Sequence, residues 1–146
     1  MIDNLLIVCE GNICRSPMAC ALFARALPGA RVFSAGTGAL HGHHADPVSI
    51  ELMDERGIDL RGHTAMALNF EIVRDAQLVL TMTRAQLEHV EAMYPFARGR
   101  VYRLGELEGI DVVDPYRQDR ATFDVSMAQI ERGVSHWLDV INRLAS

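Results

Sequence analysis

The chain has 146 residues, of which 49% are hydrophobic and 23% are charged, and its formal net charge is −5. This length and composition predict one globular domain, residues 1–146, and the acidic balance excludes a nucleic-acid binder with a basic face. All 14 basic residues are arginine, which excludes lysine Schiff-base chemistry and a Walker-type phosphate lysine.

Short apolar strands alternate with helices along the chain. Strands are predicted at 4–8, 31–35, 76–81 and 100–104, and helices at 17–27, 47–57, 69–73, 84–93 and from 120 to the end. Asp46 and Asn69 are predicted N-caps, and Trp137 lies on the apolar stripe of the last helix. The alternation predicts an α/β fold with a doubly wound parallel sheet and helices on both faces.

The cysteines and the N-terminal residues favour a cytoplasmic protein. Cys9, Cys14 and Cys20 form an odd, clustered set, which does not suggest a secreted disulfide framework or a structural zinc site. The apolar run before Glu10 is about five residues long, too short for a signal peptide or a membrane span.

The stretch from Val8 to Pro17 joins the first strand to the first helix. Gly11 and Asn12 accept positive φ at low cost, so the backbone N–H groups can curl inward around an anion. Arg15 adds a planar fork that suits two phosphate oxygens, and Ser16-Pro17 predicts an N-cap followed by the first helical residue. Cys9 is then a thiolate nucleophile beneath a bound phosphate. The alternative is a buried structural cysteine beside a surface arginine.

A second loop, 105–118, supplies the candidate acid. Asp114, between apolar Val113 and rigid Pro115, is predicted to protonate the leaving oxygen and then to activate water. Asp111 is a weaker candidate for the same role and is expected to be exposed. An ordinary Asp-Pro turn is the structural alternative for Asp114.

These motifs together resemble the low-molecular-weight protein-tyrosine phosphatases. The stretch 8–17 is similar to the active-site loop of that family, and the resemblance continues in Ser34-Ala35-Gly36, Gly62-His63 and Asp114-Pro115-Tyr116. It therefore covers essentially the whole chain. The resemblance implies a four-stranded sheet with the first strand in the middle, a cysteinyl-phosphate intermediate and no cofactor.

The resemblance also assigns roles to residues around the loop. The substrate-binding set that it implies is Glu10, Gly11, Asn12, Ile13, Cys14, Leu40 and Tyr116. Ser34 and His63 would support Asn12 in a hydrogen-bond network, and Ser16 would donate to Cys9. The plainer alternatives are a turn residue for Asn12, a helix cap only for Ser16 and a surface histidine for His63.

The other two cysteines have separate expectations. By resemblance, Cys14 forms a reversible disulfide with Cys9 that protects the nucleophile from over-oxidation, and its alternative is a small packed residue. Cys20 falls within the first helix and is expected in the core.

Substrate class follows from the walls of the predicted slot. The walls of an apolar slot would be formed by Ile13, Leu40 and Tyr116. The phosphate of a phosphotyrosine side chain can reach the bottom of such a slot, whereas phosphoserine is too short. Relatives that act on phosphoarginine carry threonine at the position of Ile13. Leu40 and Tyr116-Arg117 resemble the bacterial members paired with tyrosine autokinases of capsule and exopolysaccharide export, which makes such an autokinase the expected partner.

Three other functions stay open at this point. They are a protein-arginine phosphatase, an arsenate reductase of the same fold and a phosphate-binding regulator without turnover. An arsenate reductase would need cysteines in the later half of the chain, and none follows Cys20.

A histidine-rich segment raises the question of a metal site. His41, His43, His44 and Asp46 carry ligand-type side chains, but two adjacent histidines do not easily share one geometry. We expect no metal and a loop that borders the substrate.

Overall fold

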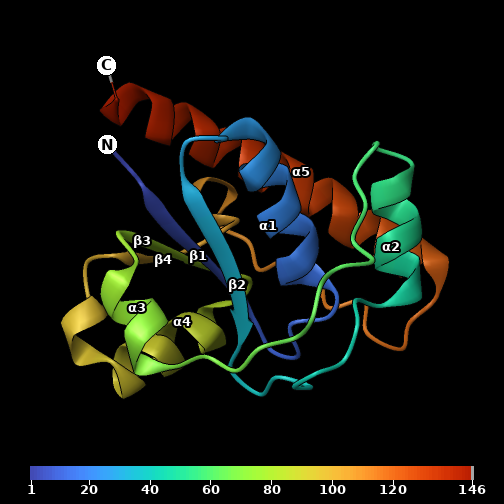
Figure 1. The fold of residues 1–146 in the computed structure, drawn as a ribbon, viewed down its shortest axis with the longest axis horizontal. Helices are drawn as coiled ribbons and strands as arrows, with labels where there is room; N and C mark the ends of the chain where they lie inside the picture. The colour runs from blue at the N-terminus through green and yellow to red at the C-terminus, as the bar shows by residue number, and fades with distance from the viewer. Residues whose placement is uncertain (146) are drawn as a thin grey trace.

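Four parallel strands form the centre of the protein, as seen in a computed structural model that describes residues 1–145 (Figure 1). The strands are β1 (Asn4–Cys9), β2 (Arg31–Gly36), β3 (Leu78–Thr81) and β4 (Val101–Arg103), in the order β2-β1-β3-β4. All three pairings are parallel. The predicted four-stranded sheet with its first strand in the middle is confirmed.

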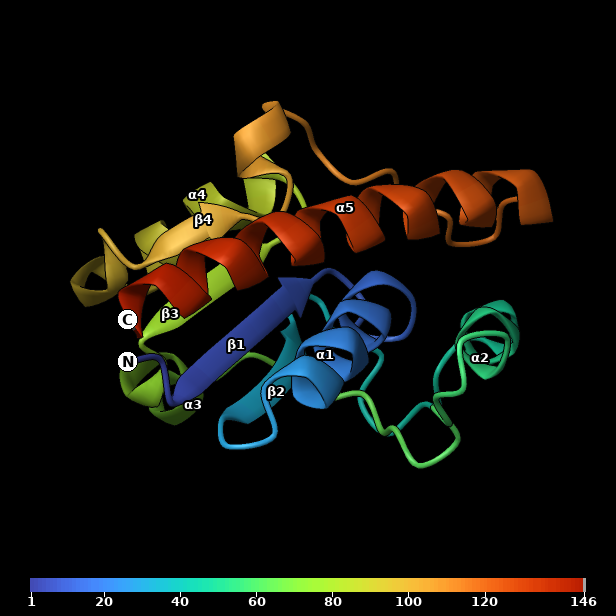
Figure 2. The ribbon, with the colours of Figure 1, turned by 90° about the horizontal axis from the view of Figure 1, so that it is seen from above.

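Helices cover both faces of this sheet (Figures 1 and 2). The helices are α1 (Arg15–Ala26), α2 (Pro47–Asp54), α3 (Phe70–Asp75), α4 (Arg84–Met93) and α5 (Arg120–Leu144), with single 3-10 turns at Pro95–Ala97 and Glu106–Glu108. α1 and α5 lie together on one face, α2 packs against the same pair, and α3 and α4 lie on the other face. Within residues 1–145, no helix combines the length and the apolar character that crossing a membrane requires.

Alternate residues of β1 serve the two faces. Leu5 and Ile7 pack with buried side chains of α1 and α5, whereas Leu6 and Val8 pack with those of α3 and α4. Because both faces are covered, the strand is apolar throughout instead of alternating with polar residues. Trp137 of α5 is buried in the first of these layers, as its position on the apolar stripe predicts.

The predicted helix starts are right at α2 and α3 and wrong at α1. The side chains of Asp46 and Asn69 cap α2 and α3 as expected. Ser16 is not an N-cap, because α1 already begins at Arg15 and has no side-chain cap. Pro17 is tolerated as the third residue of the helix, because the N–H groups of the first turn have no partner inside a helix.

The parallel arrangement decides where the two predicted functional loops meet. One loop follows β1 and the other follows β4, so both leave the carboxyl edge of the sheet. Ligands of open α/β sheets bind beyond this edge. The topology therefore brings residues near position 10 next to residues near position 114.

Candidate active site

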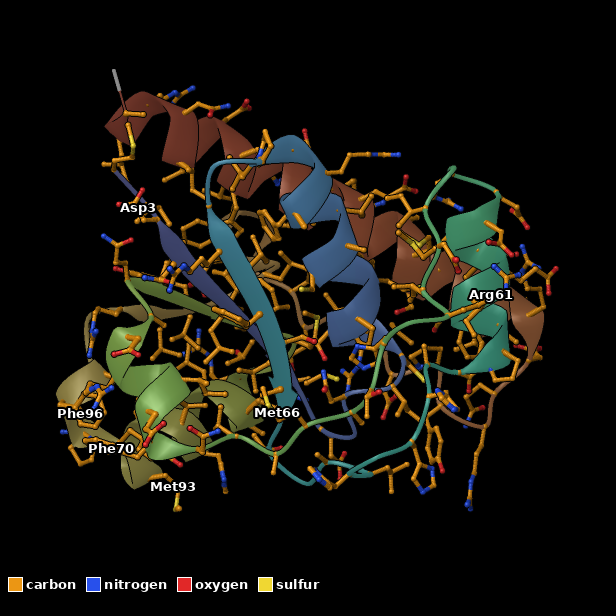
Figure 3. The ribbon with its side chains drawn as sticks, in the orientation of Figure 1. Asp3, Arg61, Met66, Phe70, Met93 and Phe96 are labelled. Carbon is orange, nitrogen blue, oxygen red and sulfur yellow. The ribbon has the colours of Figure 1, made fainter. Side chains whose placement is uncertain are left out.

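The phosphate loop, residues 9–16, is held in shape by Asn12. This buried residue has φ +59°, a left-handed conformation that asparagine adopts more readily than other non-glycine residues. Its Oδ1 accepts the N–H of Met66 at 2.9 Å, and its Nδ2 donates to Ser16 Oγ at 2.8 Å. Nε2 of His63 donates to the Asn12 carbonyl oxygen at 2.7 Å. Met66, whose backbone N–H supports the Asn12 side chain, is labelled in Figure 3 near the tip of β2.

Cys9 ends β1 and is only 2% exposed. Its Sγ lies 2.9 Å from Ser16 Oγ and 3.3 Å from the Asn12 N–H, which points at the sulfur. Since Asn12 already donates to the Ser16 oxygen, the Ser16 hydroxyl proton is free to point at the sulfur. Two hydrogen-bond donors therefore face this one sulfur atom.

Arg15 connects the phosphate loop to the acid loop, residues 105–118. Its side chain is buried, and Nη1 donates to the carbonyl oxygen of Val112 at 3.0 Å. Nη2 lies 3.6 Å from Oδ2 of Asp114. The guanidinium is thus oriented by two contacts from a segment nearly a hundred residues away.

Asp114 reaches the site from the more exposed side. Its side chain is 47% exposed, and its Oδ1 accepts the N–H of Tyr116 at 3.1 Å. Asp111, the weaker candidate, is exposed as expected and does not line the cavity. Its Oδ1 accepts the Arg84 N–H at 3.0 Å and pairs with Arg103 Nη1 at 3.2 Å. Asp111 therefore anchors the acid loop.

One cavity of ≈ 150 Å³ contains the predicted chemistry. Its lining residues are Cys9, Glu10, Gly11, Ile13, Cys14, Arg15, Gly38, Leu40, Asp114 and Tyr116. Every predicted catalytic residue is among them, and every predicted substrate-binding residue except Asn12, which lies buried behind the wall. A thiol, a guanidinium and a carboxyl group therefore face one small space.

Ser34 does not take part in the network that was expected for it. Within residues 1–145, no hydrogen bond joins its side chain to Asn12 or His63, and it lies beside the Cys20 thiol, which donates to the Val32 carbonyl oxygen at 3.7 Å. The support expected from Ser34 comes from the backbone of Met66. Cys20 is half-buried at the edge of the core, and desolvation raises the pKa of its thiol to about 11.

Cys14 is a free, buried cysteine in the same loop as Cys9. Burial raises the pKa of its thiol well above the usual range, and the charges of Asp46 and Cys9 raise it further. Its thiol is therefore neutral near pH 7. Cys9 is free as well.

The histidine-rich segment forms no metal site in the described part of the chain. His41, His43 and His44 are exposed, and no group of three or more ligand-type side chains in residues 1–145 could hold a metal ion. Asp46 instead caps α2, and its N–H donates to the Ile13 carbonyl oxygen at 2.8 Å. This bond fastens the segment to the phosphate loop.

Sequence reasoning missed the supporting roles of Gly38, Met66 and Val112, and it quoted Gly36 only as part of a motif. Gly36 is needed because a Cβ there would lie 2.3 Å from the Glu10 carbonyl oxygen. A glycine at the end of a strand is a signal of such a close approach. Met66 and Val112 act through backbone atoms, so their side chains carry no corresponding signal.

Comparison with known proteins gives a family and close relatives. The family described as low molecular weight phosphotyrosine protein phosphatase matches residues 4–146. The probable low molecular weight protein-tyrosine-phosphatase EpsP of Ralstonia solanacearum is 48% identical over 144 residues, covering 99% of each chain. The low molecular weight protein-tyrosine-phosphatase Wzb of Escherichia coli strain K12 is 39% identical over 143 residues, covering 97% of each.

Solved structures share the fold. The tyrosine phosphatase Wzb from Escherichia coli K30, in complex with sulphate, has a TM-score of 0.92 at 34% identity, covering 97% of this chain and 99% of that one. The YwlE arginine phosphatase from Geobacillus stearothermophilus has a TM-score of 0.89 at 28% identity, with coverages of 96% and 93%. Both tyrosine and arginine phosphatases therefore occur on this architecture.

Proposed function

Because the chain belongs to the family of low molecular weight phosphotyrosine protein phosphatases, we propose that Cys9, Arg15 and Asp114 carry its phosphatase reaction. The observation that supports these roles best is the shared cavity in which the thiol, the guanidinium and the carboxyl group meet. Other residues of the phosphate loop hold this geometry without taking part in bond making.

In the first step, the Cys9 thiolate attacks phosphorus in line with the tyrosyl oxygen. The S–P bond forms, the P–O bond breaks, and protonated Asp114 gives its proton to the leaving phenolate oxygen. Arg15 and the backbone N–H groups of the loop neutralise the charge on the phosphoryl oxygens. The contacts of Arg15 with Val112 and Asp114 orient its guanidinium group toward this role.

In the second step, water attacks the cysteinyl-phosphate. The Asp114 carboxylate takes a proton from the water, and the S–P bond breaks. Inorganic phosphate is released, and the Cys9 thiolate is regenerated. The 47% exposure of the Asp114 side chain suits this step, because water reaches the carboxylate directly. The Ser16 hydroxyl, 2.9 Å from the sulfur, stabilises the thiolate as a leaving group.

The cavity walls favour phosphotyrosine over the alternatives. Ile13 and Leu40 are apolar, and Tyr116 adds an aromatic face that suits a phenyl ring in a slot. The arginine phosphatase among the similar structures keeps phosphoarginine as the second candidate. The ratio of kcat/KM for a phosphotyrosine peptide and a phosphoarginine peptide of the same sequence tests this choice, and a preference for phosphoarginine would reverse it.

The proposed partner is a tyrosine autokinase of exopolysaccharide or capsule export, in the cytoplasm. The support is the similarity to EpsP and Wzb over nearly the full chain. Three free cysteines, one of them the proposed nucleophile, suit a reducing compartment. Capture by the Cys9→Ser protein of a tyrosine-phosphorylated autokinase from lysate would support the partner, and release by free phosphate would show that the catalytic cavity holds it.

The intermediate provides the most direct test of the roles. We expect acid quenching of Asp114→Ala during turnover of p-nitrophenyl phosphate to leave phosphate on Cys9, because nitrophenolate leaves without a proton donor while the second step lacks its base. Peptide mapping by mass spectrometry locates the phosphate. Phosphate on another residue, or turnover by Cys9→Ser, would contradict the assignment.

A further inference from the structure

A second hollow adjoins the catalytic cavity and plays no part in the steps above. This groove has a volume of ≈ 460 Å³ and continues from the cavity across a common rim. The residues that line both spaces are Glu10, Arg15, Gly38 and Asp114. A polypeptide that places a phosphorylated side chain in the cavity can therefore extend into the groove without leaving the surface.

The rim between the two spaces is fixed by backbone bonds. The Gly38 N–H donates to the Glu10 carbonyl oxygen at 2.9 Å, and the Thr37 N–H donates to that of Cys9 at 3.0 Å. Gly38 has no side chain, and a Cβ there would be in ordinary van der Waals contact with the Cγ of Glu10, 3.8 Å away. These bonds fix the backbone from which the Glu10 side chain extends.

The far wall of the groove is the first turn and a half of α4. Thr83 caps this helix in a capping box with Gln86, whose Oε1 accepts the N–H groups of Met82 and Thr83. Gln86 is buried, and His89 is exposed one turn further along. The groove is therefore formed by two ordered walls.

The charges around the groove are asymmetric. Glu10 is exposed, and no side chain in residues 1–145 pairs with its carboxylate. The Arg15 guanidinium is buried at the rim, engaged with Val112 and Asp114. An unpaired negative charge consequently lies beside the cationic cradle for phosphate. A ligand that complements both has a phosphate and, close to it, a positively charged group.

We propose that this groove binds a residue flanking the phosphotyrosine of the substrate and selects lysine or arginine there through Glu10. The proposal rests on the proposed function, because it takes the catalytic cavity as the phosphotyrosine site. An exposed ion pair in water is weak, so the expected preference is about two- to fivefold. Glu10 is thus a specificity-determining residue in addition to its backbone role in the loop.

The test compares kcat/KM for phosphotyrosine peptides that carry lysine or glutamate on one side of the phosphotyrosine, with a second pair for the other side. We expect lysine to be favoured over glutamate about two- to fivefold on at least one side. Glu10→Gln should bring that ratio close to one. Because the ratio compares two peptides on the same enzyme, any change in overall activity cancels.

Two further variants make the test specific. Asp139→Asn removes an equal charge from an exposed position on α5 and should leave the ratio unchanged. His89→Glu adds a carboxylate to the far wall at an exposed position and should raise the ratio, which keeps the test decisive if Glu10→Gln fails to fold.

The outcomes separate this proposal from the proposed function. Equal rates for lysine and glutamate peptides on both sides overturn the groove assignment. A ratio that Glu10→Gln leaves intact, or that Asp139→Asn lowers equally, overturns it as well. If no phosphotyrosine peptide is hydrolysed at all, the proposed function itself fails.

Discussion

The two loops that build the active site differ in how they are held. The phosphate loop is buried except around Glu10 and Gly11, and its side chains bond to one another. The acid loop is largely exposed, and Asp114 touches Arg15 only through a contact of 3.6 Å. Besides the bond from Arg15 to the Val112 carbonyl oxygen, it has anchors outside the cavity: Arg103 holds Asp111, and the Gln129 side chain accepts the Val113 N–H at 2.8 Å.

This difference matches the demands of the chemistry. The nucleophile and the phosphate cradle act on a charged transition state, and such stabilisation requires dipoles that are already oriented. The acid has to exchange protons with the leaving oxygen and with water, which requires access. A buried hydrogen-bond network therefore suits the phosphate loop. An exposed position, with firm attachment away from the cavity, suits the acid loop.

The largest loss of activity is expected from removing the proposed nucleophile in the phosphate loop. Cys9→Ser keeps the size of the side chain but loses the thiolate, so kcat should fall on the order of 10⁴-fold or more. The affinity for inorganic phosphate should stay near that of the wild type, because the cradle is formed by other groups. Release of p-nitrophenol measures kcat, and calorimetry measures phosphate binding. Loss of both would show that the cradle depends on the thiol.

Removing the acid tests the other loop. Asp114→Asn should lower kcat for a phosphotyrosine peptide by about 10²-fold, within the usual contribution of a general acid. The first-turnover loss with p-nitrophenyl phosphate should be much smaller, because nitrophenolate leaves without a proton. Burst kinetics with both substrates measure the difference. Equal losses would remove Asp114 from the role of acid.

Asn12 shows how far the rigidity of the phosphate loop depends on one side chain. Asn12→Ala leaves the Met66 N–H without its partner and keeps the strained φ, so it should cost about 2–3 kcal/mol of unfolding free energy. Asn12→Gly loses the same bonds but accepts φ +59°, and should recover about 1 kcal/mol. Urea denaturation of both variants gives the two values. Equal stability of the two would mean that the backbone carries no strain there.

The smallest effect on activity is expected from a substitution at Asp111, which anchors the acid loop. Asp111→Asn weakens the pair with Arg103, and because the Asp111 side chain is half exposed the stability loss should stay below about 1 kcal/mol. A looser loop positions Asp114 less well, so phosphotyrosine turnover should fall about two- to fivefold. Turnover of p-nitrophenyl phosphate should fall less. Glu106→Gln, which alters the other partner of Arg103, is the matched control and should not change this substrate dependence.

Most of the nucleophile side of the site could be predicted from residues that are neighbours in the chain. Cys9, Gly11-Asn12 and Arg15 lie within one strand–loop–helix unit, so their types and spacing already define a phosphate cradle. The apolar runs of the strands likewise predicted a sheet covered on both faces. Asp114 was found because its motif matches that of a known family.

Other contacts depended on how distant segments pack, and the sequence does not encode them locally. The side chain of Ser34 lies beside Cys20, while the backbone of Met66 supports Asn12. The Val112 carbonyl oxygen orients Arg15 across a sequence separation of 97 residues. Backbone N–H and C=O groups are the same in every residue except proline, so only the packing of β1 with its neighbours decided which of them would meet the site.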